Sequence, residues 1–214
     1  MHALETDGTL IQSYSLTSFT KEPTGLAFDP TTGYMFISDD SKYRVFWVDP
    51  ANPTVKLGEF ATKPLGSMDP DDISVDPNNG HLFIINGTPS RNIIETNSTG
   101  TQVFSNITLP STIQDPDALV YDAREDVFYV GMKSSYNIWQ VDRSGAILDT
   151  IDILSGYRNP INNANVKIDD LEFAPSSDPN DDPGKLSLFV ADYGADQVND
   201  GRLFEIHLGD LLVA

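Results

Sequence analysis

The amino-acid sequence predicts an all-β protein, a β-propeller of four-stranded antiparallel blades, and three observations support this fold class. A nine-residue pattern occurs four times in the 214 residues, at spacings of 47, 46 and 52 residues. Short apolar runs follow each copy, rich in β-branched and aromatic residues and separated by turn-forming residues. No segment keeps a helical apolar period over three turns. Four short strands in a repeat of about 45 residues are typical of a propeller blade.

The repeated pattern predicts the innermost strand of each blade. Its copies, of which the last is the weakest, are Glu22–Pro30, Asp69–Pro77, Asp115–Ala123 and Lys167–Pro175. Each copy carries two large apolar residues at alternate positions, as a strand with one buried face requires. These residues are Leu26, Phe28, Ile73, Val75, Leu119, Tyr121, Leu171 and Phe173.

Further apolar runs predict the outer strands. The second strands are Tyr34–Ser38, His81–Ile85, Val127–Gly131 and Leu188–Ala191, and the third are Arg44–Val48, Asn92–Glu95, Asn137–Val141 and Arg202–Ile206. The fourth runs are Leu10–Leu16, Val55–Phe60, Gln102–Leu109 and Ile147–Leu154. One domain over 1–214 then divides into repeats at about 7–50, 51–100, 101–145 and 146–210. An irregular β-sandwich is the alternative, although its strands need not recur in groups of four.

Completion of the ring stays open at this point. Leu10–Leu16 beside Arg202–Ile206 would close a four-bladed ring. Alternatively, the ring is partial, and another copy of the chain or further blades of a longer parent complete it. Ala3–Asp7 resembles the end of a strand from such a blade. Because exposed sheet edges tend to pair, we expect either closure or a defined oligomer.

The charge of the chain restricts its partners and its chemistry. There are 13 Lys and Arg against 32 Asp and Glu, a net charge of −19. This excess of acid excludes nucleic acid and anionic membrane surfaces as partners and favours cations. The absence of cysteine excludes disulfides, zinc–thiolate sites and thiol nucleophiles. No apolar run approaches the length of a membrane span, and the first residues lack the features of a signal peptide.

Acidic residues are predicted to gather at one mouth of the propeller channel. In antiparallel blades, the start of the first strand and the end of the second lie at the same mouth. The candidate metal ligands at these positions are Glu22, Asp39, Asp69, Asp71, Asp72, Asn86, Asp115, Asp117, Asp169, Asp170 and Asp192, with Asp40 beside them. The opposite mouth receives Asp29, Asp76 and Asp122, which are typical turn residues.

Calcium is the cation that this pattern favours, because it takes six to eight oxygen ligands in flexible geometry. The alternative is that these acidic residues form turns or a solvated surface without a metal. Zinc and copper are disfavoured, because His2, His81 and His207 are scattered and cysteine is absent. A second acidic segment, Asp178–Asp182, is expected to be a loop between the first two strands of the last blade.

A family resemblance rests on three motifs. They are the pattern Glu/Asp-Pro-x-Gly/Asp-Leu-Ala-x-Asp-Pro, the sequence Phe-Ile-Ser-Asp at 36–39 and the sequence Val-Phe-x-Val-Asp at 45–49. With the C-terminal stretches 187–196 and 199–206, they resemble bacterial six-bladed propellers of the NHL type and the phytase-like group. The resemblance implies calcium along and above the channel, and a phytase-like or esterase-like hydrolase activity.

Two functions therefore remain open. One is a calcium-binding propeller module of an extracellular or periplasmic protein, whose acidic mouth binds a basic protein or a small molecule. The other is a calcium-dependent hydrolase, with Lys42, Arg44, Arg91 and Lys133 as candidate phosphate-binding residues. No nucleophile elbow and no phosphate-binding glycine-rich loop occurs, and catalytic residues cannot be assigned.

Overall fold

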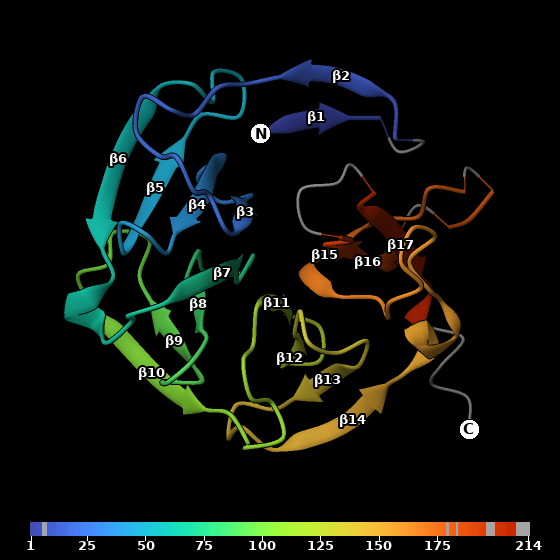
Figure 1. The fold of residues 1–214 in the computed structure, drawn as a ribbon. Coiled ribbons are helices and arrows are strands. Elements are labelled where there is room, and N and C mark those ends of the chain that lie inside the picture. The colour runs from blue at the N-terminus through green and yellow to red at the C-terminus, as the bar shows by residue number, and fades with distance from the viewer. Residues whose placement is uncertain (6–7, 179, 183, 196–199, 209–214) are drawn as a thin grey trace.

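The predicted all-β propeller is confirmed by a computed structural model, which describes residues 1–5, 8–178, 180–182, 184–195 and 200–208. Four antiparallel sheets surround a central channel, with their first strands innermost, and a two-stranded hairpin lies between the last sheet and the first (Figure 1). We number the sheets as blades one to four in chain order. Among the described residues, no helix has the length and apolar character needed to cross a membrane.

The first two blades each contain four strands in chain order from the channel outwards. Blade one contains β3 (Leu26–Asp29), β4 (Tyr34–Asp39), β5 (Arg44–Val48) and β6 (Lys56–Ala61). The short 3₁₀ helix η1 (Lys63–Leu65) leads into the next blade. Blade two contains β7 (Pro70–Val75), β8 (Leu82–Asn86), β9 (Asn92–Thr96) and β10 (Val103–Thr108).

The third blade repeats this order, and the fourth has three strands among the described residues. Blade three contains β11 (Ala118–Asp122), β12 (Val127–Gly131), β13 (Ile138–Val141) and β14 (Ile147–Ile151), followed by the 3₁₀ helix η2 (Ile153–Gly156). Blade four contains β15 (Ile168–Pro175), β16 (Leu186–Asp192) and β17 (Arg202–Ile206). The acidic segment expected as a loop lies between β15 and β16, and its residue 179 is outside the described residues.

Of the two alternatives for completing the ring, closure by Leu10–Leu16 beside Arg202–Ile206 is not observed. Strand β2 (Leu10–Ser13) pairs antiparallel with β1 (His2–Leu4), and β17 has only β16 as a partner among the described strands. Downstream of β2, Leu16 and Phe19 are buried against Ile37 and Phe46 of blade one. This apolar contact holds the segment beside the first blade, so it does not extend the last one.

Apolar residues at alternate strand positions form a core between each pair of neighbouring blades. Leu119 and Tyr121 of β11 pack against Phe83 and Ile85 of blade two. Equivalent clusters join blade one to blade two and blade three to blade four. The two large apolar residues of an inner strand therefore face the preceding blade, as their period of two predicts.

Polar side chains complete the contact between inner strands. Because no described strand pairs with the channel edge of an inner strand, the N–H groups on that edge need other acceptors. Asp72 Oδ2 accepts the N–H of Leu119 at 2.7 Å, and Ser74 Oγ accepts that of Tyr121 at 3.0 Å. Blade two therefore holds the inner strand of blade three by two hydrogen bonds that are two residues apart.

Close packing of blade one on blade two requires glycine at position 25. A Cβ atom on Gly25 would lie 2.3 Å from Asp72 Oδ1 and 2.6 Å from Asp72 Cα, which is too close for either to remain in place. We expect Gly25→Ala to lower the free energy of unfolding by about 1–3 kcal/mol, because overpacking forces the two inner strands apart. Urea unfolding followed by tryptophan fluorescence measures the change.

Gly156 provides the matched control, because nothing lies within 4 Å of the position that a Cβ atom would take there. Gly156→Ala should leave the stability within about 0.5 kcal/mol of the native chain or raise it slightly. Equal unfolding midpoints for the two variants would contradict the role given to Gly25.

Candidate functional site

Three carboxylates meet at one mouth of the channel, between blades one and two. Asp40 follows the end of β4, Asp69 precedes β7, and Asp71 lies in β7. One oxygen of each lies within 4.8 Å of the others, and all three residues are half-buried. This spacing allows a single cation to contact all three carboxylates.

The backbone at Gly87, directly after β8, faces the same carboxylates. Asp71 Oδ2 accepts the Gly87 N–H at 2.8 Å. A Cβ at Gly87 would lie 2.5 Å from Asp71 Oδ2, 2.8 Å from Asp69 Oδ2 and 3.1 Å from Asp115 Oδ1. Glycine therefore leaves the space in which the carboxylates of two successive loops converge. Asp115 also accepts the N–H and the hydroxyl of Thr88, at 2.9 and 2.7 Å.

Two buried polar atoms at this mouth have no hydrogen-bond partner among the described residues. They are Asp40 Oδ1 and the side-chain nitrogen of Asn86. Asn86 is completely buried, and its oxygen accepts a long hydrogen bond of 3.4 Å from the Asp69 N–H. Buried polar atoms are normally paired, so Asp40 Oδ1 can accept from a water or bind a cation, and the Asn86 nitrogen can donate to a water or another acceptor.

A lysine balances part of the acid on the far side of this mouth. Lys133 Nζ lies 2.9 Å from Asp169 Oδ1 and 3.7 Å from Asp117 Oδ1. Its backbone N–H donates to Asp117 Oδ2 at 2.7 Å. Asp117 and Asp169 are therefore paired with a cationic side chain, whereas no ion pair is found for Asp40, Asp69 or Asp71 among the described residues.

The crowding of carboxylates changes their ionisation. Burial raises the pKa of Asp71 to about 8, and the neighbouring charges of Asp69 and Asp117 add to the effect. Burial also raises the pKa of Asp69, with further contributions from Asp40 and Asp115. Asp71 is thus held largely protonated at neutral pH unless a cation joins it, and the ionised form of Asp69 is disfavoured in the same direction.

Other predicted ligands lie in structural hydrogen bonds. Asp39 is buried and accepts the hydroxyls of Thr20 and Ser41, while Asp192 binds Arg202 at 2.7 Å. Asp72 links blades two and three, and Glu22 is exposed outside the three-carboxylate group. Asp170 lies near Asp72, where burial raises the pKa of Asp72 well above its usual value and that of Asp170 to about 7.

The predicted phosphate-binding residues do not converge in the same way. Lys42 donates to the carbonyl of Phe19, and Arg44 forms an ion pair of 3.1 Å with Glu59 on the neighbouring strand. Arg91 lies in the turn between β8 and β9, where its N–H donates to the Gly87 carbonyl at 2.9 Å. Of the four, only Lys133 makes ion pairs with carboxylates of the acidic mouth within the part of the chain that the structure describes.

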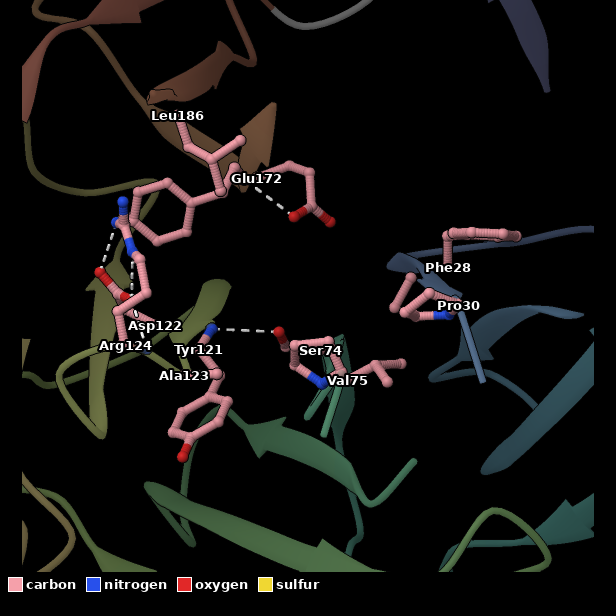
Figure 2. Close-up of a pocket in the computed structure, with 13 residues that line it drawn as sticks. Phe28, Pro30, Ser74, Val75, Tyr121, Asp122, Ala123, Arg124, Glu172 and Leu186 are labelled. Atoms are coloured by element: carbon pink, nitrogen blue, oxygen red, sulfur yellow. Dashed lines mark hydrogen bonds and ion pairs between the residues drawn. The ribbon is translucent and has the colours of Figure 1, made fainter. Parts of the chain in front are cut away.

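The opposite mouth is different in character. A cavity of about 390 Å³ lies where the inner strands end, and most of its lining is apolar. Figure 2 shows Phe28 and Pro30 of the first blade across an open space from Glu172 and Leu186 of the fourth. Arg124 lies against the ring of Phe173, 5.3 Å from its centroid, while it binds Asp122 at 2.7 Å. The sequence indicated only turn residues at this mouth and not the cavity.

Comparisons with known proteins support the fold. No family model matches the chain, and no curated protein sequence matches it. Hydrazine synthase of Kuenenia stuttgartiensis has a TM-score of 0.55 and 17% identity, over 92% of this chain and 50% of that one. A protein of unknown function from Bacteroides caccae has a TM-score of 0.51 and 15% identity, over 89% and 60%. At these identities the likeness shows a shared β-propeller fold, and the chain spans about half the length of these structures.

The ionisation of the acidic mouth predicts that, when divalent cations are removed, the free energy of unfolding depends on pH. Because the pKa of Asp71 is about 8 in the folded chain and near 4 when unfolded, the folded chain binds more protons between these values. Its stability should therefore fall as the pH rises from about 5 to about 8. Asp71→Asn should reduce this slope. Thermal melts in a chelator at several pH values measure it.

The exposed Asp149 on β14 supplies the control for this measurement. Asp149→Asn removes the same charge from the chain and should leave the slope unchanged. The ionisation assigned to Asp71 would be refuted if both variants altered the slope by the same amount.

Proposed function

We propose that this chain is a binding module whose acidic channel mouth holds a calcium ion. The observation that carries the proposal is the convergence of Asp40, Asp69 and Asp71 within 4.8 Å of one another. Asp40 Oδ1 is buried and has no other partner among the described residues, so it is free to bind a cation.

The donor set suits calcium better than other common metals. Three carboxylates are hard oxygen ligands, and a loop backbone with space at Gly87 allows the irregular geometry of calcium. Magnesium requires near-ideal octahedral geometry and retains its waters, and no described cluster offers the histidine or thiolate ligands of zinc. An extracellular or periplasmic location accompanies this proposal, because weak calcium sites fill where free calcium is abundant.

The hydrolytic alternative has less support from the geometry. Phosphoester hydrolysis at a calcium ion also needs cationic groups that hold the phosphate. Lys42 and Arg44 are engaged by a carbonyl and by Glu59, and Lys133 is engaged by two aspartates. A bound cation at the acidic loops needs no free cationic side chains, whereas phosphoester hydrolysis does, so cation binding fits these contacts better.

Calcium should raise the melting temperature of the chelator-treated chain. At a hundredfold excess over its Kd, a ligand that binds only the folded state adds about 2.7 kcal/mol of stability. Magnesium should add less. The double variant Asp69→Asn with Asp71→Asn should lose most of the calcium effect while melting higher than the native chain in chelator, because it removes like charges.

The matched control is the pair Asp149→Asn and Asp152→Asn on the outer side of blade three, where both residues are exposed. This pair should keep the full calcium response. If calcium does not change the melting temperature of the native chain, the acidic mouth holds no calcium ion and the proposal fails.

A further inference from the structure

The inner strand of blade one exposes two apolar side chains, whereas the side chains at the equivalent repeat positions of blades two and three are buried. Leu26 and Phe28 are 38% and 54% exposed. At the equivalent repeat positions, Ile73 and Val75 are 2% and 8% exposed, and Leu119 and Tyr121 are 1% and 7% exposed. The buried pairs face a preceding blade, and the same face of blade one turns towards the opening before it.

The opposite wall of this opening carries hydrogen-bond acceptors in a pattern that the chain already uses. By position in the repeat, Asp170 and Glu172 of β15 correspond to Asp72 and Ser74 of β7. They lie on the face of β15 opposite Leu171, which packs against blade three. Asp170 and Glu172 therefore face away from blade three, as Asp72 and Ser74 face away from blade one.

The hydrogen bonds of the two aspartates show the parallel in detail. Asp72 Oδ1 accepts the N–H of the next residue at 2.7 Å, and Asp170 Oδ1 does the same at 2.7 Å. Asp72 Oδ2 then holds the N–H of Leu119 in the next inner strand. For Asp170 and Glu172, the second carboxylate oxygen has no backbone donor among the described residues, although the side chain of Asp170 also makes a hydrogen bond with that of Asp72, which a strand in the opening would have to share or replace.

The hairpin β1–β2 occupies only the outer part of the position between blades four and one (Figure 1). Among the described strands, β1 pairs with β2 and with no other, so its inner edge is unpaired. The cavity at the apolar mouth opens between Phe28 on one wall and Glu172 on the other (Figure 2). Among the described residues, the position therefore lacks the two inner strands that each complete blade contains.

We propose that this opening binds a β-hairpin from another polypeptide, whose inner strand donates two alternate backbone N–H groups to Asp170 and Glu172. The large apolar side chains of the bound inner strand pack on blade four. The small side chains on its other face cover Leu26 and Phe28, in the same way that Ala27 of β3 faces blade two. A second copy of this chain is disfavoured as the occupant, because each copy carries a net charge of −19. The proposal does not depend on calcium at the other mouth.

The experiment uses a probe that copies the chain's own inner hairpin. A peptide with the sequence of Asp117–Gly131 contains β11, β12 and their turn, and head-to-tail cyclisation preforms it. With a fluorophore at the turn position of Arg124, anisotropy reports its binding to the intact chain. We expect saturable binding that is weakened at least tenfold when the peptide amides equivalent to Leu119 and Tyr121 are N-methylated.

Variants of the chain test the same contacts from the other side. Asp170→Ala with Glu172→Ala should weaken binding at least tenfold, whereas Asp170→Asn with Glu172→Gln should retain most of it, because amide oxygens still accept hydrogen bonds. Phe28→Ser removes an exposed apolar contact and should weaken binding about tenfold without unfolding the chain. Asp149→Ala is the control and should bind as the native chain does.

Several results would overturn the proposal. They are the absence of saturable binding, equal affinity for the N-methylated peptide, and unchanged affinity in the Phe28→Ser chain. Sedimentation velocity should show a monomer at micromolar concentration. A dimer that dissociates on Asp170→Ala with Glu172→Ala would assign the opening to a second copy instead and would likewise overturn it.

Discussion

The hydrogen bonds of Asp72 are the interaction on which the arrangement of the blades depends. An inner strand pairs on one side only, and its other edge must find acceptors away from bulk water. Asp72 supplies one by reaching from blade two to the N–H of Leu119, and this reach is possible because Gly25 allows the first blade to pack directly on the Asp72 backbone. Burying a carboxylate away from water costs free energy unless its oxygens are hydrogen-bonded. The two oxygens of Asp72 meet this requirement, because they accept the N–H groups of Ile73 and Leu119.

The same close packing of inner strands explains why acid accumulates at one mouth. The loops entering β7 and β11 are drawn together where they approach the channel, and the turn after β8 closes on them at Gly87. Asp69, Asp71 and Asp115 all lie close to Gly87 there. Repulsion between these carboxylates is an energetic cost that a cation at the proposed position would offset.

The sequence repeat was sufficient to locate the four inner strands and the mouth at which the acidic loops meet. Both follow from the position of a residue within the repeated pattern, which can be read directly from the sequence. The membership of the three-carboxylate group was harder to predict. Asp39 and Asp40 are adjacent, and only the turn geometry decides that Asp39 is buried against Thr20 while Asp40 joins Asp69 and Asp71. The pairing of β2 with β1 was missed for a similar reason, since the burial of Leu16 against Phe46 is a long-range contact without a local signal.

The two candidate sites lie in different parts of the ring and have different physical origins. The acidic group is formed where blades one, two and three are fully packed, so its geometry is fixed by contacts that already exist. The opening between blades four and one is formed where those contacts stop, and there the repeat still provides the apolar pair on one wall and the acceptor pair on the other. A strand edge and an apolar face that each match an existing interface in the same chain are specific recognition features, because an occupant must satisfy both at once. The proposed cation binding and the proposed hairpin binding therefore rest on different contacts, and a change that removes one should leave the other intact.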